Sequence, residues 1–253
     1  MENCIKSTLG DEDKLRQLKN CKVWHVFINK FSQQPMTRQS ECCEWYKLRN
    51  QMVEDQLIAR GIYDPRVIHA MRTVKRHKFV PTDKLSKAYE DGPLPIGLGQ
   101  TISQPYIVAH MSELLRIGPN DTVLEVGTGS GYQAAVLSHL ASHVITVETI
   151  PLLANEAKET IQSMGIKNIS VLKGDGSLGT PHHGPYDAII VSAAAPRIPS
   201  PLIRQLKTGG MLVAPIGTKN SQNLVLYKKM VCRSVQKTLY HVRFVSLIGK
   251  WGV

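Results

Sequence analysis

The stretch VLEVGTGSGY, residues 123–132, is the strongest indication of this chain's fold. It continues a short apolar strand, TVLEV (122–126), into a turn that carries glycine at positions 127, 129 and 131. A helical pattern follows from Gly131 to Leu140. Glycines let the backbone turn sharply and come close to a ligand. A buried strand that leads through such a turn into a helix predicts a ligand site at the end of a parallel sheet.

The spacing of these glycines separates two kinds of cofactor. A dinucleotide site favours G-x-G-x-x-G, whereas this turn is G-x-G-x-G and follows an acid, Glu125. A pyrophosphate needs a turn free of negative charge, but a cofactor with a sulfonium and an ammonium group tolerates a nearby carboxylate. The turn therefore favours a cationic cofactor over a nicotinamide dinucleotide, although a lone glycine turn is often only a tight turn.

Acids also end the next two strands that the sequence predicts. The strand HVITVE (143–148) ends in Glu148, where a carboxylate can hydrogen-bond both ribose hydroxyls of an adenosine. The following strand ends in Asp175 and Gly176, where an acid can accept from the adenine amino group and a glycine keeps the rim open. A lone acid at a strand end is usually a solvated cap. Three acids at successive strand ends share one crevice, and with the glycine turn they favour an adenosyl cofactor.

Alternating strands and helices continue along the second half of the chain. They predict an α/β fold with a mostly parallel, doubly wound sheet. Two alternating segments close to each other near the end predict a terminal antiparallel pair. The further strands are ISVLKG (169–174), YDAIIVS (186–192) and GMLVAPIG (210–217), the helices are 152–164 and 201–206, and the antiparallel pair is NLVLYKKMV (223–231) with LYHVRFVSL (239–247).

The first half predicts helices and one unusual loop. A helical pattern runs from Met52 to Arg60 and stops at Gly61, and Asp64 before Pro65 is typical of a helix N-cap. LPIGLGQTISQP (94–105) carries no charge and is broken by glycine and proline, so we expect a loop before a helix over 105–116. Ser103 at its end has an alternative interpretation as a helix N-cap. Residues 1–45 are polar and weakly periodic, and we expect an extension to the domain.

The charge is uneven along the chain. The net charge is +11, and residues 191–253 hold ten Lys or Arg and no acid. This distribution predicts an anionic partner, either a carboxylate substrate or nucleic acid. No arginine-rich block favours nucleic acid, and no apolar run is long enough for a membrane span. Five cysteines without C-x-x-C spacing predict reduced thiols in the cytoplasm, and the histidines show no metal-ligand spacing.

Beyond these patterns, the chain resembles a known family. VLEVGTGSGYQAAVL, GDG and YDAIIVSAAAP are similar to S-adenosylmethionine-dependent methyltransferases. MVEDQLIARGIYDPRVIHAMRTVKRHKFVP and YEDGPLPIGLGQTISQPYIVAHMSELL narrow the resemblance to the protein-L-isoaspartate (D-aspartate) O-methyltransferases, from about Asn50 to Leu247. The resemblance implies a Rossmann-like methyltransferase domain over 46–253. Residues 46–117 would form its helices and active-site loop, and residues 118–253 its cofactor-binding sheet and C-terminal strands.

The resemblance also implies roles for particular residues. In that family the GQTIS segment lies over the cofactor and lines the acceptor site, so Ser103 would orient the carboxylate that is methylated. A V-P-L-like segment near the end pairs with the substrate main chain, and here Val245 and Leu247 would bind substrate, with Ser246 in place of the proline. No metal is implied. The cofactor-binding residues would be Gln100, Thr101, Ile102, Ser103, Glu125, Gly127, Thr128, Gly129, Gly131, Glu148, Asp175 and Gly176.

The implied activity is protein repair. A methyl group would pass from S-adenosyl-L-methionine to the free α-carboxylate of L-isoaspartyl residues, leaving S-adenosyl-L-homocysteine. The ester would then close spontaneously to a succinimide, whose hydrolysis returns some aspartate. We expect isoaspartyl proteins and peptides as partners, neither nucleic acid nor membrane, and a cytoplasmic monomer. The alternatives are a methyltransferase of another acceptor, a non-catalytic S-adenosylmethionine-binding adaptor, and a nicotinamide oxidoreductase.

Overall fold

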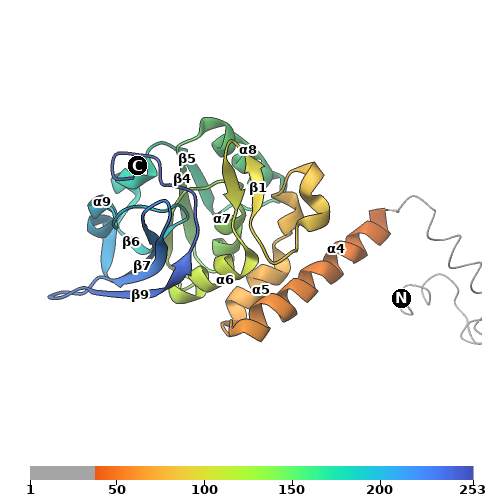
Figure 1. Cartoon of the computed structure of the whole chain (residues 1–253), viewed down its shortest axis with the longest axis horizontal. Helices are drawn as coiled ribbons and strands as arrows, with labels where there is room; N and C mark the ends of the chain where they lie inside the picture. Colours follow the sequence, from red (N-terminus) through yellow and green to blue (C-terminus); the bar gives the residue numbers. More distant parts are fainter. Residues whose placement is uncertain (1–37, 253) are drawn as a thin grey trace, which may run out of the picture. The chain divides into compact units, whose positions relative to one another are not determined.

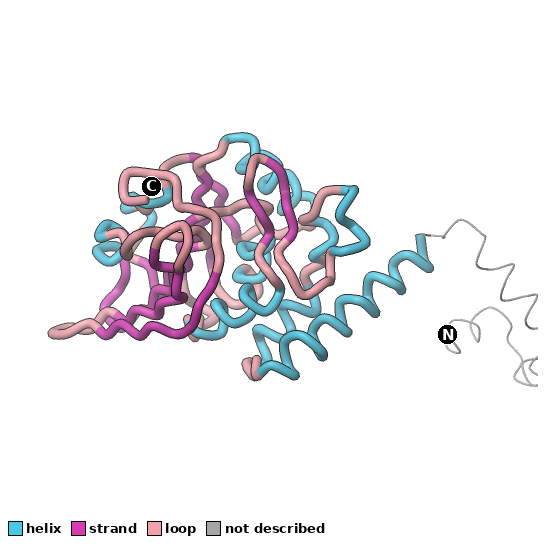
Figure 2. The backbone as a smooth tube through the Cα atoms, viewed as in Figure 1, coloured by secondary structure: helices cyan, strands magenta, loops and turns pink. Residues whose placement is uncertain are grey.

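A computed structural model describes residues 38–252 of the chain (Figures 1 and 2). From Trp45 onward the chain forms one compact unit. Helix α4 (Arg38–Met52) begins before that point, so the boundary predicted after residue 45 falls inside a helix. Most of the predicted extension, residues 1–37, lies outside the described residues.

A seven-stranded sheet forms the centre of this unit (Figure 1). Its strand order is β5-β4-β3-β6-β7-β8-β9, in which β3 to β7 are parallel and β8 and β9 run antiparallel at one edge. This arrangement confirms the predicted fold class. The strands are β3 (Thr122–Val126), β4 (His143–Glu148), β5 (Ile169–Lys173), β6 (Tyr186–Val191), β7 (Leu206–Gly217), β8 (Gln222–Lys228) and β9 (Val235–Val242).

Both faces of the sheet are buried under helices, as a parallel sheet requires. Consecutive residues of β3 show this, because Val123 packs in one hydrophobic core and Leu124 in the other. The first core lies under α5 (Pro65–Thr73), α6 (Pro105–Leu114), α7 (Tyr132–Leu137) and α8 (Pro151–Ser163). The second lies under α9 (Ser200–Gln205), which contributes Leu202. The doubly wound sheet leaves its strand ends free to form a site.

The N-terminal helices end where the sequence predicts. After α4 the chain continues as a π-helical turn (Val53–Leu57) and a 3-10 turn (Ile58–Arg60). Gly61 has φ +87°, a conformation that favours glycine, and it ends this helical run. Asp64 caps α5, since its carboxylate accepts from the Arg66 N–H at 2.8 Å. Further 3-10 turns lie at Arg76–Lys78, Thr82–Lys87, Gly176–Leu178 and Pro181–His183.

The stretch 94–105 is not the loop that we expected. It forms an antiparallel hairpin of β1 (Leu94–Gly97) and β2 (Gln100–Ile102), which we call the cover hairpin. Its tip, Gly97-Leu98-Gly99, has φ of 93°, 51° and 72°. We expected a loop because strands of only four and three residues are too short to show the alternation that predicts a strand. In a two-stranded sheet each strand has one free edge, where a proline such as Pro95 is tolerated.

The last predicted strand is also displaced. Strand β9 starts at Val235 and ends at Val242, earlier than the predicted 239–247. Beyond β9, the buried side-chain amide of Gln222 makes two hydrogen bonds to the main chain of Phe244. The amide oxygen accepts from the Phe244 N–H at 2.7 Å, and the amide nitrogen donates to the Phe244 carbonyl at 3.1 Å. The ladder therefore stops, and residues 243–248, which we call the crossing segment, pass over to Ala194 beyond β6.

Residues 38–252 were compared with the features of membrane spans, metal sites and reactive thiols. No helix there has the length and apolar character of a bilayer-spanning segment. No group of three or more His, Cys, Asp or Glu side chains is arranged to hold a metal ion within the same range. Cys43 and Cys232 are exposed free thiols.

Candidate active site

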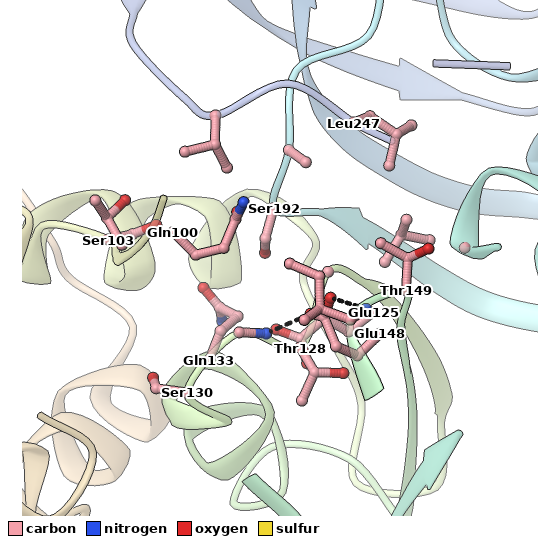
Figure 3. Close-up of a pocket in the computed structure, with 18 of the residues that line it drawn as sticks. Gln100, Ser103, Glu125, Thr128, Ser130, Gln133, Glu148, Thr149, Ser192 and Leu247 are labelled. Carbon is pink, nitrogen blue, oxygen red and sulfur yellow. Dashed lines mark hydrogen bonds between the residues drawn. The ribbon is translucent and has the colours of Figure 1, made fainter. Parts of the chain in front are cut away.

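A cavity opens at the carboxyl ends of the central strands (Figure 3). Its empty volume is about 740 Å³ with its open mouth included, within the range of small-molecule sites. One side, which we call the cofactor wall, is made by Glu125, Gly127, Thr128, Gly129, Glu148 and Gly176. The other, the acceptor wall, is made by Gln100–Ser103 of the cover hairpin, Ser192, and Val245–Ile248 of the crossing segment.

The glycine turn forms the floor of the cofactor wall. Gly127, Gly129 and Gly131 all have positive φ, at 92°, 52° and 87°. The Gly127 N–H donates to Val147 of β4 at 2.9 Å, so the turn stays attached to the sheet. Gly131 does not line the cavity, because a Cβ there would lie 3.1 Å from Ile161 Cδ1 of α8. We predicted Gly131 as a cofactor-binding residue. In the structure it packs against α8 instead, and so lets α7 lie close to α8.

Glu148 presents a fixed carboxylate to the cavity. Its Oε2 accepts from the Gly129 N–H at 2.8 Å, and its Oε1 accepts from the Ile150 N–H at 3.0 Å. The side chain is only 6% exposed. Each oxygen keeps a further lone pair, which suits two neighbouring hydroxyl donors such as those of a ribose.

Glu125 is fully buried, and one of its oxygens has no hydrogen-bond partner among the described residues. Its Oε2 accepts from Thr146 Oγ1 at 2.6 Å, and Thr146 is in turn hydrogen-bonded to Thr128 Oγ1. Burial raises the pKa of Glu125 to about 8, the bond from Thr146 opposes this, and the charge of Glu148 adds to it. An unpaired buried acceptor beside a cavity fits a cationic ligand that completes its bonding.

Asp175 lies away from the cavity, unlike its neighbour Gly176. Its carboxylate accepts from the Ser177 N–H at 2.9 Å and from the Lys250 N–H at 2.8 Å. Burial would raise the pKa of Asp175, but these hydrogen bonds outweigh it and the pKa lies below its usual range. Asp175 is not among the residues that line the cavity, and we expect its main contribution to be the anchoring of the Lys250 end of the crossing segment. Its predicted contact with adenine stays a prediction. Gly176 does line the cavity, and a Cβ there would meet Val126 Cγ1 at 2.7 Å.

The cover hairpin lies over the glycine turn. A Cβ placed on Gly129 would be 3.5 Å from Ile96 Cδ1 of β1, so the hairpin and the turn are in direct contact. Figure 3 shows Gln100 and Ser103 on the rim opposite Leu247, with Glu125, Thr128 and Glu148 below them. The N-cap alternative for Ser103 is wrong, because Gln104 holds that position and makes no side-chain cap bond. The Ser103 hydroxyl is therefore available to a ligand.

The crossing segment completes the acceptor wall from the other side. The Val245 carbonyl accepts from the Ala194 N–H, and the Leu247 N–H donates to the Ala194 carbonyl, both at 2.8 Å. Beyond Leu247, the Lys250 and Trp251 N–H groups bind Asp175 and Ser177. The segment is thus held at both ends across the mouth of the cavity.

Sequence reasoning missed several lining residues. Gln133 is buried and donates to Ser112 Oγ at 2.9 Å, and nothing in its helical pattern marks it. Thr149 and Ile150 directly follow Glu148, so their place next to a predicted ligand acid was a usable signal. Ser192 follows β6 next to the glycine turn, with its Cβ 3.6 Å from a Cβ built on Gly127.

These walls fit an S-adenosyl cofactor. The cofactor wall combines an unpaired buried carboxylate oxygen on Glu125, free lone pairs on Glu148 and glycines that admit a close approach. The first suits a cationic group, the second suits ribose hydroxyls, and neither suits a pyrophosphate. The residues present therefore match the cofactor that the glycine spacing predicts.

Comparison with known proteins agrees with this geometry. The family model described as Protein-L-isoaspartate(D-aspartate) O-methyltransferase matches residues 47–252. Protein-L-isoaspartate O-methyltransferases from Methanoculleus marisnigri and Syntrophobacter fumaroxidans are 54% and 52% identical, each over 81% of this chain and over 93% and 96% of their own length. A putative Plasmodium falciparum member, solved in complex with S-adenosyl-L-homocysteine, superposes with a TM-score of 0.68 at 27% identity, covering 79% of this chain and 98% of that one. This chain belongs to the protein-L-isoaspartate(D-aspartate) O-methyltransferase family.

Proposed function

We propose that this cavity methylates the free α-carboxylate of L-isoaspartyl residues in damaged proteins, with Ser103 as the residue that orients the carboxylate. The observation that supports this most directly is the pairing of two walls: one carries buried carboxylates and the other carries only neutral side chains. S-adenosyl-L-methionine, held by Glu125, Glu148 and the glycine turn, supplies an electrophilic methyl group on a sulfonium. S-adenosyl-L-homocysteine is the product.

The chain needs no general base for this reaction. A carboxylate acceptor is ionised at neutral pH, so it is already nucleophilic. What the protein must supply is alignment of one carboxylate oxygen with the methyl group. A hydrogen bond from the Ser103 hydroxyl to the acceptor provides that alignment without Ser103 itself attacking.

The neutral acceptor wall also assists the transfer. When an anion attacks a sulfonium, charge is cancelled, and water stabilises the separated charges more than it stabilises the transition state. Gln100, Thr101 and Ser103 offer hydrogen bonds without adding a charge, and Val245 and Leu247 exclude water. Substrate is thus bound between a hydroxyl-bearing hairpin and the apolar side chains of Val245 and Leu247.

A pair of peptides tests the proposal. The peptides have the same sequence, one with an L-isoaspartyl residue and its twin with a normal aspartyl residue, and both are incubated with methyl-labelled S-adenosyl-L-methionine. We expect label on the isoaspartyl peptide and background on the twin. Equal labelling of both, or labelling of neither with the cofactor bound, contradicts the proposal.

We also propose that the enzyme is a cytoplasmic monomer acting on isoaspartyl proteins and peptides. Light scattering at working concentration tests this: a mass near 28.1 kDa is expected, and a stable dimer contradicts it.

A further inference from the structure

Gln133 brings to the cavity a side-chain amide whose orientation is fixed. It lies in the first turn of α7, and the residue is only 8% exposed. The Ser112 hydroxyl of α6 donates its one hydrogen to the Val108 carbonyl at 2.8 Å, so its oxygen can only accept from Gln133, at 2.9 Å. The amide nitrogen of Gln133 must therefore face Ser112, and the amide oxygen, Oε1, lies on the other side of the amide group.

This Oε1 atom is a free acceptor at the cavity. Within residues 38–252 the Gln133 amide makes its side-chain hydrogen bond through the nitrogen, and none uses Oε1. Nor is Oε1 one of the fully enclosed side-chain atoms that lack a partner in this part of the chain. Since Gln133 lines the cavity, its Oε1 is open to a ligand there.

Helix α6 relates this acceptor to the acceptor wall. Ser103 lies two residues before α6, and Val108, in the first half of the helix, lines the same cavity. Ser112, one turn further along, holds the Gln133 amide. Figure 3 shows Gln133 below Gln100 and Ser103. A single helix therefore sets the Gln133 amide relative to the hydroxyl that we assign to the substrate carboxylate.

The two kinds of aspartyl residue differ in what lies next to the free carboxylate. In an L-isoaspartyl residue, the carbon that carries this carboxylate also carries a main-chain N–H. In a normal aspartyl residue, the free carboxylate is attached to a methylene group. An acceptor beside the carboxylate site thus meets an N–H in the first and a C–H in the second, where it stays unpaired, and an unpaired buried acceptor is costly.

We propose that Gln133 Oε1 accepts a hydrogen bond from the main-chain N–H of the isoaspartyl residue while Ser103 orients its carboxylate. The inference rests on the proposed function, and it adds the group that distinguishes isoaspartyl from aspartyl residues. Ser112 is a positioning residue, because it acts only through the Gln133 amide. The amino group of the cofactor has a stronger acceptor in the buried carboxylate of Glu125, which leaves Oε1 to the substrate.

An altered peptide tests this bond without altering the protein. The nitrogen of the isoaspartyl residue is replaced by oxygen, so that the amide becomes an ester and the N–H is lost. With the parent enzyme we expect kcat/KM to fall about fivefold, which corresponds to one neutral hydrogen bond. An ester three or more residues away is the control, and it should change kcat/KM by less than about twofold. An unchanged kcat/KM for the first ester overturns the proposal.

A substitution identifies the partner of that N–H. Gln133→Met keeps the length of the side chain and removes the amide, so the ratio of kcat/KM between amide and ester peptides should fall from about five to about one. Gln162→Met, at an exposed position on α8, is the matched control and should keep the parent ratio. Ser112→Ala releases the Gln133 amide and should lower the ratio to about two, which a purely structural role of Ser112 would not do. A ratio of about five in a folded Gln133→Met overturns the proposal.

Cofactor affinity separates the proposal from its alternative. We expect Gln133→Met to bind S-adenosyl-L-homocysteine within about twofold of the parent. A large loss of that affinity, with the amide-to-ester ratio still about five, would assign Oε1 to the amino group of the cofactor and overturn the proposal. Absence of transfer by the parent to any isoaspartyl peptide would instead overturn the proposed function.

Discussion

The two walls of the cavity are built in opposite ways. The cofactor wall carries two carboxylates, Glu125 and Glu148, with exposures of 0% and 6%, at the ends of adjacent parallel strands. The acceptor wall carries no charged side chain, and most of it comes from a short hairpin and a crossing segment that lie outside the seven-stranded sheet. Glu148, and Glu125 once a bound cation stabilises its ionised form, favour a cationic cofactor, whereas a neutral surface favours a transfer that cancels charge.

The walls also differ in what holds them. Main-chain bonds of the parallel ladder continue into the glycine turn and fix the cofactor wall. The acceptor wall has only the short β1–β2 ladder and two main-chain bonds to Ala194, and side chains add to these, since Gln222 and Asp175 bind main-chain groups before and after the crossing segment. We therefore expect substitutions on the first wall to change cofactor affinity and substitutions on the second to change turnover or peptide affinity.

The strongest test of this division is Glu148→Ala. It removes a charged acceptor for ribose hydroxyls and leaves the Gly129 and Ile150 N–H groups without their partner. We expect affinity for S-adenosyl-L-homocysteine to fall about 100-fold, measured by calorimetry, because hydrogen bonds to charged groups contribute about 1.5–3 kcal/mol each. Glu156→Ala, at an exposed position on α8, is the matched control. Normal binding by Glu148→Ala would remove the ribose assignment.

Ser103→Ala tests the acceptor wall. Loss of one hydrogen bond to a carboxylate should lower kcat for an isoaspartyl peptide about tenfold. Affinity for S-adenosyl-L-homocysteine should stay within about twofold of the parent, because the cofactor wall is untouched. Steady-state kinetics and calorimetry on the same preparation give both values. A variant as active as the parent would show that Ser103 does not position the acceptor.

The buried acid Glu125 predicts a pH dependence of stability in the cofactor-free protein. Its pKa of about 8 exceeds the value of 4.5 in the unfolded chain, so the folded state keeps a proton that the unfolded state releases. Stability from this group is therefore present below pH 4.5 and is lost as pH rises toward 8, with a slope approaching about 1.4 kcal/mol per pH unit.

Glu125→Gln supplies the reference for this effect, because its side chain does not titrate. The difference in unfolding free energy between parent and variant, measured in urea from pH 5 to pH 9, should change in the stated direction and level off above about pH 8. A difference that is constant with pH would mean that Glu125 is ionised in the folded protein across this range.

Asp175→Asn should have the smallest effect on cofactor binding. The carboxylate binds the Ser177 and Lys250 N–H groups away from the cavity, so affinity for S-adenosyl-L-homocysteine should change by less than about threefold. The thermal midpoint should fall by a few degrees, about 1 kcal/mol, because the end of the crossing segment loosens. A loss of affinity as large as that of Glu148→Ala would support the predicted adenine contact.

The cofactor wall was largely predictable from the sequence, for a physical reason. Its residues follow directly on apolar strands whose length and alternation with helices are local signals. Strands β3 and β4 begin and end at the predicted residues. Parallel strands bring their ends to one edge, so Glu125 and Glu148 had to meet. Asp175 also lies just after the end of a parallel strand. Its carboxylate, however, accepts a hydrogen bond from the Lys250 N–H, 75 residues away in the sequence, and no local pattern predicts that contact.

The acceptor wall was predictable only in part. Its residues Gln100–Ser103 were identified by resemblance, but the hairpin they form is too short to show strand periodicity. The crossing segment was expected inside the last strand, because its alternation continues past Val242. The side chain of Gln222 ends the ladder there, and the sequence does not show that a glutamine will compete with the strand for its bonds.

The most direct test of the two-wall cavity is a crystal structure of the complex with S-adenosyl-L-homocysteine. We expect ribose hydroxyls within hydrogen-bond distance of the Glu148 carboxylate, the amino group toward Glu125, and the sulfur facing Gln100 and Ser103. Adenosine bound away from the glycine turn, or a sulfur that faces away from the cover hairpin, would contradict it.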